Sequence, residues 1–164
     1  MIMAPNIQTE AEAFAKSYAS LFSSPACSTS DGVAGIAEDV GRRYHPGVTI
    51  FTNGKITRFE SQQEAARLIE QEMRSNITSG MGTHLELIAI EKIETYSPGL
   101  ALCWLHWAFH PQAGSEFGGK SWEFTNIYGY RAATDDAEAG FEFVIRDNEI
   151  NAFAEATGKS FLAE

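Results

Sequence analysis

Apolar side chains recur at helical spacing in three stretches of the first half of the chain, residues 9–24, 31–44 and 61–77. Thr9 and Ser61 each have a glutamate three residues later, as in a capping box, and Asp31 can cap the second stretch. The apolar residues that would form the three buried stripes are Phe14, Ala15, Tyr18, Leu21, Phe22, Val33, Ile36, Ala37, Val40, Ala65, Leu68, Ile69, Met73 and Ile77. We therefore predict three helices, of which the second ends at residues 44–47, where Pro46 moves His45 out of helical geometry.

The second half alternates between apolar and polar positions, which is typical of strands. Residues 48–52 and 55–59 flank Asn53-Gly54 and predict a tight hairpin before the third helix. Residues 83–96 form a half-buried strand, Pro98-Gly99 turns the chain, and residues 100–111 and 121–131 form a long aromatic hairpin. Residues 141–150 predict a last strand, and residues 151–157 predict a short helix. This order predicts one α+β domain over residues 1–164, with a curved, mixed but mainly antiparallel sheet wrapped around three helices and enclosing a pocket. Residues 1–8 are expected to be flexible.

Composition narrows the classes of partner. The chain has 44% hydrophobic and 21% charged residues, as a globular domain does. Its formal net charge of −10 repels phosphate backbones and anionic lipid, so neither nucleic acid nor membrane is an expected partner. The first residues lack the basic and apolar regions of a signal peptide, and Cys27 and Cys103 make no disulfide framework. A reducing, cytoplasmic location is expected.

The long hairpin holds the candidate chemistry. If the loop of residues 111–120 is symmetric, His106 lies opposite Asn126 and Trp104 opposite Tyr128. If Pro98-Gly99 makes a two-residue turn, Glu91 lies beside His106 on the other side. One row across three strands would then read Glu91, His106, Asn126.

Such a row suits proton transfer on a small hydrophobic carbonyl compound. The carboxylate of Glu91 would orient the imidazole of His106, which titrates near neutrality. Asn126 and Tyr128 could polarise a carbonyl oxygen. The predicted apolar wall consists of Trp104, Phe124 and Trp122. Asp147 at the pocket mouth and Tyr44 on the cone wall complete the candidate site, which needs no cofactor.

Plainer interpretations stay open for these residues. The row can be a satisfied polar patch, Trp104 and Tyr128 can be core or interface aromatics, Asp147 can lie in a solvated turn, and Tyr44 can cap a helix end. Arg146 and Asn148 are expected to form surface contacts. His106 and His110 lie ~13 Å apart along a strand, so even with His84 no metal site is predicted.

The Asn53-Gly54 hairpin before the third helix and the aromatic strands after it resemble the nuclear transport factor 2-like superfamily, over nearly the whole chain. In the order of its elements and the aromatic character of its strands, the chain is most similar to the SnoaL-like branch of polyketide cyclases, dehydratases and isomerases. The resemblance implies a cone-shaped fold with a central pocket. Epoxide-hydrolase members use an Asp-Arg-Asp set, which has no residue-by-residue match here, and scytalone dehydratase-like members use Tyr, His and Asp.

Three functions follow from this pattern. The first is a cofactor-free lyase, isomerase or cyclase, the second a non-catalytic ligand-binding or assembly module, and the third a protein-partner adaptor. Homodimerisation is also expected, because the second face of the hairpin is too apolar to face water. That face would carry Leu105, Trp107, Phe109 and Ile127.

Overall fold

The structure is a computed structural model that describes residues 6–159. Its helices are α1 (Ile7–Leu21), the short 3-10 helix η1 (Pro25–Ser28), α2 (Val33–Gly41), α3 (Gln62–Thr78) and α4 (Asp147–Thr157). Its strands are β1 (Tyr44–Thr52), β2 (Lys55–Arg58), β3 (Leu85–Ser97), β4 (Leu100–Phe109), β5 (Trp122–Arg131) and β6 (Gly140–Ile145). Among these described residues no helix is both long and apolar enough to cross a bilayer.

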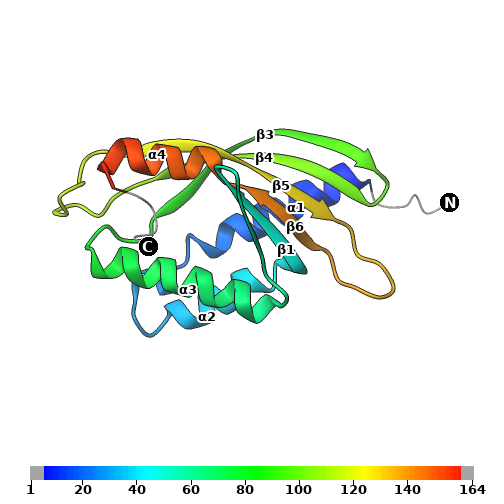
Figure 1. Cartoon of the computed structure of the whole chain (residues 1–164), viewed down its shortest axis with the longest axis horizontal. Helices are drawn as coiled ribbons and strands as arrows, with labels where there is room; N and C mark the ends of the chain where they lie inside the picture. The colour runs from blue at the N-terminus through cyan, green and yellow to red at the C-terminus, as the bar shows by residue number, and fades with distance from the viewer. Residues whose placement is uncertain (1–5, 160–164) are drawn as a thin grey trace.

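The strands form one open sheet in the order β2-β1-β6-β5-β4-β3. β1 and β6 are parallel, and the other neighbours are antiparallel. Figure 1 shows this bent sheet arching over α1, with α2 and α3 side by side below it and α4 against the sheet at one end. The predicted α+β class and the mixed, mainly antiparallel sheet are confirmed.

Local signals explain several of these elements. Asn53 and Gly54 have φ angles of 47° and 85°, the left-handed values that a type I′ hairpin turn requires. The Ser61 side chain accepts a hydrogen bond from the backbone N–H of Glu64 and caps α3. At the end of α2, a Cβ on Gly41 would come within 2.8 Å of Ala66, so the glycine lets α2 and α3 pack closely. The predicted hairpin and third helix are confirmed.

Three predicted boundaries are wrong. α1 begins at Ile7 with Asn6 as its cap, so Ile7 and Gln8 of the predicted flexible segment are helical, while residues 1–5 lie outside the described residues. The second helix ends at Gly41, and Tyr44 begins β1. The last strand ends at Ile145 and α4 begins at Asp147, because the acidic residues that follow Arg146 suit the first turn of a helix.

The predicted register of the long hairpin is displaced by one residue. His106 pairs with Thr125, and Asn126 pairs with Leu105. A loop of residues 111–120 places His110 beside Ser121, and the observed pairs continue from there. Because side chains alternate between the faces of a sheet, this single step moves Asn126 to the face opposite His106.

The inner face of the sheet, which the helices cover, carries the aromatic core. Leu105, Trp107 and Phe109 are buried there, so three of the four residues predicted on an exposed apolar face lie in the interior. Ile127 lies on the outer face, where it pairs with Trp104 and Ile145. Homodimerisation through the outer sheet face stays a prediction, which sedimentation of the purified chain would test, but three of the four residues proposed to drive it lie on the inner face.

Candidate functional site

A cavity of about 110 Å³ lies between the inner face of the sheet and the helices α1, α3 and α4. A cavity needs only ~10–15 Å³ of such volume to hold one water molecule, so this one can admit a small organic molecule. Most of its wall is carbon. Its apolar lining includes Phe59, Leu68, Ile69, Met73, Trp107 and Val144.

The polar part of the cavity is centred on Arg146, which lies between β6 and α4. Its Nη1 donates to Glu72 Oε1 of α3 at 3.0 Å, and its Nε donates to Glu149 Oε2 of α4 at 2.6 Å. The Arg146 and Glu72 side chains are 12% exposed and that of Glu149 is 17% exposed. The cluster therefore places one cation and two carboxylates, a formal charge of −1, in a largely dehydrated wall.

An amide extends this cluster along β5. Asn126 is 2% exposed, and its Nδ2 donates to Glu149 Oε2 at 3.0 Å. The same nitrogen lies 3.5 Å from Tyr128 Oη, two residues further along the same face of the strand. Because alternate side chains of β5 share one face, the polar cluster extends from α4 to the aromatic centre of the cavity.

Two further phenols meet nearby. Tyr18 Oη of α1 and Tyr44 Oη of β1 lie 2.6 Å apart in a buried hydrogen bond. Only one of the two hydroxyl protons can occupy that bond, so the other is free to point at a ligand. Tyr18, Tyr44 and Tyr128 all line the cavity.

Burial controls the ionisation of this site. It raises the pKa of Glu72, and Arg146 offsets this only in part. Burial lowers the pKa of Arg146, but Glu149 and Glu72 more than compensate, so that its guanidinium stays charged. Burial also raises the pKa of Tyr44 to about 12, and it raises the pKa values of Tyr18 and Tyr128 well above their ordinary value. The phenols are therefore neutral donors, and Glu72 holds a proton more readily than an exposed carboxyl does.

Two buried polar atoms have no hydrogen-bond partner among residues 6–159, Trp107 Nε1 and Asn126 Oδ1. Both residues line the cavity, and one atom is a donor while the other is an acceptor. A buried polar group without a partner costs about 1–3 kcal/mol. A bound molecule or water that satisfied either atom would recover part of that cost.

The cavity wall brings together five of the predicted site residues. They are Tyr44, Trp122, Phe124, Asn126 and Tyr128. Trp104, His106 and Glu91 are absent from this wall, because the observed register turns Trp104 and His106 to the outer face. The predicted row of Glu91, His106 and Asn126 therefore does not form, and the mechanism built on it is corrected.

On the outer face, His106 and Glu91 do meet. His106 Nδ1 lies 3.5 Å from Glu91 Oε1, and its Nε2 lies 3.0 Å from Glu123 Oε1. Thr125 Oγ1 donates to Glu91 Oε1 at 2.8 Å. The side chains of Glu91 and Glu123 are 44% and 58% exposed, so this outer cluster is open to water.

Asp147 and Arg146 also depart from their predicted places. Asp147 Oδ1 accepts from the backbone N–H of Asn53 at 2.7 Å, and thereby holds α4 to the β1–β2 turn. Asp147 is absent from the cavity wall. Arg146, predicted on the surface, is buried, whereas Asn148 Nδ2 donates to the backbone oxygen of Thr125.

Sequence reasoning missed Tyr18, Glu72, Arg146 and Glu149 as site residues. Glu72 follows Leu68 by four positions and Ile69 by three, which places it on the apolar stripe of α3. A lone carboxylate on such a stripe needs a buried cation. Arg146 is the partner that the structure supplies.

The comparisons with known proteins address the fold. No family model matches the chain, and no curated protein matches it. A solved NTF2-like protein of unknown function from Shewanella oneidensis aligns over 84% of this chain and 95% of its own, with 11% identity and a TM-score of 0.58. An NTF2-like protein with a cystatin-like fold from Novosphingobium aromaticivorans aligns over 91% and 85%, with 14% identity and a TM-score of 0.54.

A ketosteroid isomerase-like protein from Erwinia carotovora atroseptica aligns over 82% of this chain and 89% of its own, with 12% identity and a TM-score of 0.54. At such low identities the likeness concerns the backbone and not the residues of the site. These likenesses confirm the predicted fold. The chain has the nuclear transport factor 2-like fold.

Proposed function

We propose that the chain is a cofactor-free enzyme that moves protons on a small hydrophobic carbonyl compound bound in the inner cavity. The observation that carries this proposal is the buried cluster of Glu72, Arg146 and Glu149 facing the same small apolar cavity as three neutral phenols. Isomerases, dehydratases and cyclases of this kind need one group that accepts a proton and one that stabilises an oxyanion.

The carboxylate pair Glu72 and Glu149 is the proton acceptor. The hydrogen bonds that Glu149 makes within residues 6–159 use Oε2, which leaves Oε1 for a substrate C–H. Arg146 contacts both carboxylates, so protonation of one carboxylate changes the proton affinity of the other. The raised pKa of Glu72 makes this carboxylate a stronger base than an exposed glutamate.

The phenols stabilise the negative charge that the substrate develops. When the C–H bond next to the carbonyl breaks, its electron pair moves to the carbonyl oxygen and the proton moves to the carboxylate pair. The free hydroxyl proton of the Tyr18–Tyr44 pair donates to that oxygen. Return of the proton to another carbon gives isomerisation, and its delivery to a departing hydroxyl gives dehydration.

Proton exchange tests this step without knowledge of the final product. The chain is incubated in D₂O with a panel of small cyclic ketones and enones, and deuterium uptake beside the carbonyl is followed by NMR. We expect catalysed exchange by the native chain and a roughly 10²–10⁴-fold loss in Glu149→Gln and Glu72→Gln. Glu91→Gln is the matched control on the outer face and should retain the native rate.

Two results would overturn the enzyme proposal. One is exchange that survives both cavity substitutions but is lost in Glu91→Gln or His106→Ala. The other is saturable binding of the panel in the cavity with no exchange above the background rate. The second result would favour the alternative of a non-catalytic binding module. The ion pairs that Arg146 makes with both carboxylates support this alternative, because these charged groups already satisfy one another.

A second reaction is favoured by the chemical kind of the cluster. Two carboxylates joined by one arginine resemble the Asp-Arg-Asp set of the epoxide-opening members of the superfamily. Water would attack an epoxide carbon and lose its proton to Glu149, while Glu72 in its acid form would protonate the departing oxygen. Incorporation of ¹⁸O from labelled water into the diol product of small cyclic epoxides would distinguish this reaction from proton exchange on ketones.

A further inference from the structure

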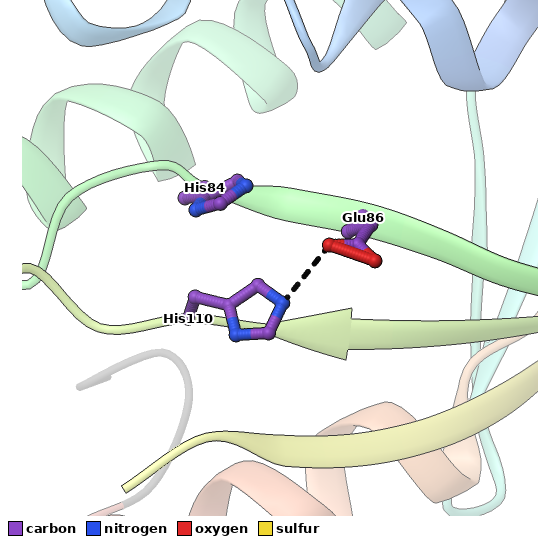
Figure 2. A group of neighbouring side chains, drawn as sticks. All are labelled: His84, Glu86 and His110. Carbon is purple, nitrogen blue, oxygen red and sulfur yellow. Dashed lines mark hydrogen bonds and ion pairs between the residues drawn. The ribbon is translucent and has the colours of Figure 1, made fainter. Parts of the chain in front are cut away.

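We propose that His84, Glu86 and His110 form a binding site for a divalent first-row transition metal, best suited to Zn²⁺. This site is separate from the inner cavity, and its existence does not depend on the function proposed there. One ligand atom from each of the three residues lies within 4.8 Å of the other two. Figure 2 shows the ring of His110 directed toward Glu86 on the neighbouring strand, with His84 near the start of that strand.

The backbone fixes the three side chains on one end of the sheet. His84 and Glu86 stand two residues apart, so they project from the same face at the start of β3. His110 follows β4, and its backbone N–H donates to the carbonyl of His84 at 3.0 Å. The rings of His84 and His110 have centroids 4.8 Å apart. Small side-chain rotations therefore suffice to bring the three groups to one ion.

The distance between His110 and Glu86 already suits two ligands of one ion. His110 Nε2 lies 3.3 Å from Glu86 Oε2. Two ligand atoms on a tetrahedral zinc also lie about 3.3 Å apart, given bond lengths of ~2.0–2.1 Å. A cation can thus bridge this pair with little change in their separation.

Ser121 supplies the support that metal-binding imidazoles usually have. Its Oγ lies 2.7 Å from His110 Nδ1. When Nδ1 carries the proton and donates to Ser121, the lone pair of Nε2 faces the Glu86 carboxylate. Two hydrogen-bond acceptors then face each other, and a cation bound between them removes this repulsion. Two imidazoles and a carboxylate favour zinc and its neighbours over Mg²⁺ or Ca²⁺, which prefer oxygen ligands.

The surroundings leave the ion open to a fourth ligand. The side chain of His110 is 33% exposed and that of Glu86 is 51% exposed. His84 and His110 also border a half-open hollow of about 380 Å³, together with Thr83, Gln112 and Ala113. Three protein ligands with a free position can hold water or a small anion. The net charge of −10 favours the approach of a cation.

The absence of a metal site was predicted from the wide spacing of His106 and His110 along one strand. That argument considered the wrong neighbours. Cross-strand pairing brings His84 to His110, and strand alternation adds Glu86, whereas His106 pairs with Thr125 further along the sheet. The three ligands therefore come from two chain segments, and 24 positions separate Glu86 from His110.

The test is titration of the untagged, chelator-treated chain with Co²⁺, followed by visible absorption, and competition with Zn²⁺. We expect one Co²⁺ per chain, displaced by Zn²⁺. Ser121→Ala should weaken binding roughly 10–100-fold, as loss of an outer-shell partner does, and His84→Ala or His110→Ala should weaken it more. His106→Ala is the matched control, because it removes an imidazole bounded by two glutamates on the same face.

Far-UV circular dichroism of each variant checks that the exposed substitutions leave the fold intact. Saturable binding that is lost in His84→Ala and His110→Ala but retained in His106→Ala supports the site. The proposal is overturned if the native chain shows no saturable binding, if His84→Ala and His110→Ala bind like the native chain, or if His106→Ala loses binding to the same extent.

Discussion

The two faces of the central sheet carry similar groups in opposite surroundings. The inner face and its helices hold Glu72, Arg146 and Glu149 in a wall that is less than one-fifth exposed. The outer face holds His106 between Glu91 and Glu123, whose side chains are about half exposed to water. Dehydration strengthens electrostatic interactions and shifts pKa values, whereas exposure screens them. The comparison teaches that chemistry depends on which face a residue occupies, and this is set by the strand register.

The largest effect on stability is expected from Arg146→Met. Removal of the guanidinium leaves two buried carboxylates without their shared cation, which should lower the free energy of unfolding by about 3–5 kcal/mol. Denaturant unfolding measures the loss. Arg131→Met is a matched control, since Arg131 at the end of β5 binds Glu142 with its side chain 35% exposed. An equal loss in both variants would remove the contrast between the buried pair and the half-buried one.

A smaller effect separates two neighbours on β5. Asn126→Ala removes the donor to Glu149 and should cost about 1–3 kcal/mol, because the buried carboxylate loses a partner. Thr125→Ala removes an exposed donor to Glu91 and should change stability by about 0.5 kcal/mol or less. Thermal unfolding of the two variants therefore tests which face of β5 each residue occupies, and hence the strand register. A reversed order would mean that the faces are assigned the wrong way round.

The pH dependence of stability sharpens the same contrast. The pKa of Glu72 is raised above its ordinary value of 4.5, so above pH 4.5 the folded chain retains a proton that the unfolded chain releases. The contribution of Glu72 to the free energy of unfolding therefore falls as pH rises from 4.5 to the folded pKa. The difference between the native chain and Glu72→Gln, measured by urea unfolding across this range, should decline with pH. A difference that rises with pH would contradict the buried assignment.

Local signals in the sequence were sufficient for the elements but not for the site. The Asn53-Gly54 turn and the Ser61 cap act within a few residues, so they could be predicted. The register of the long hairpin was also within reach, because a loop of residues 111–120 gives the observed pairing. The irregular pairing of β3 with β4 was not, since it shifts between residues 87 and 89 and again between 90 and 92 without a turn signal.

The polar cluster could not be assembled from the sequence for a different reason. Glu72 and Arg146 are 74 positions apart and meet only because α3 and the start of α4 close over the same end of the cavity. Helical periodicity marks Glu72 as a carboxylate on a buried stripe, and the acidic residues after Arg146 mark a helix start. Neither pattern indicates that Glu72 and Arg146 are partners. Tertiary packing alone makes them a pair.

The tryptophans offer the most direct test of the central claim that the inner cavity is the ligand site. Trp107 and Trp122 line the cavity, whereas Trp104 pairs across the outer face. Indole N–H resonances, assigned with single Trp→Phe variants, can be followed by NMR during titration with cyclohex-2-enone. We predict saturable shifts at Trp107 and Trp122 and none at Trp104. A saturable shift at Trp104 without one at either cavity tryptophan would contradict the account.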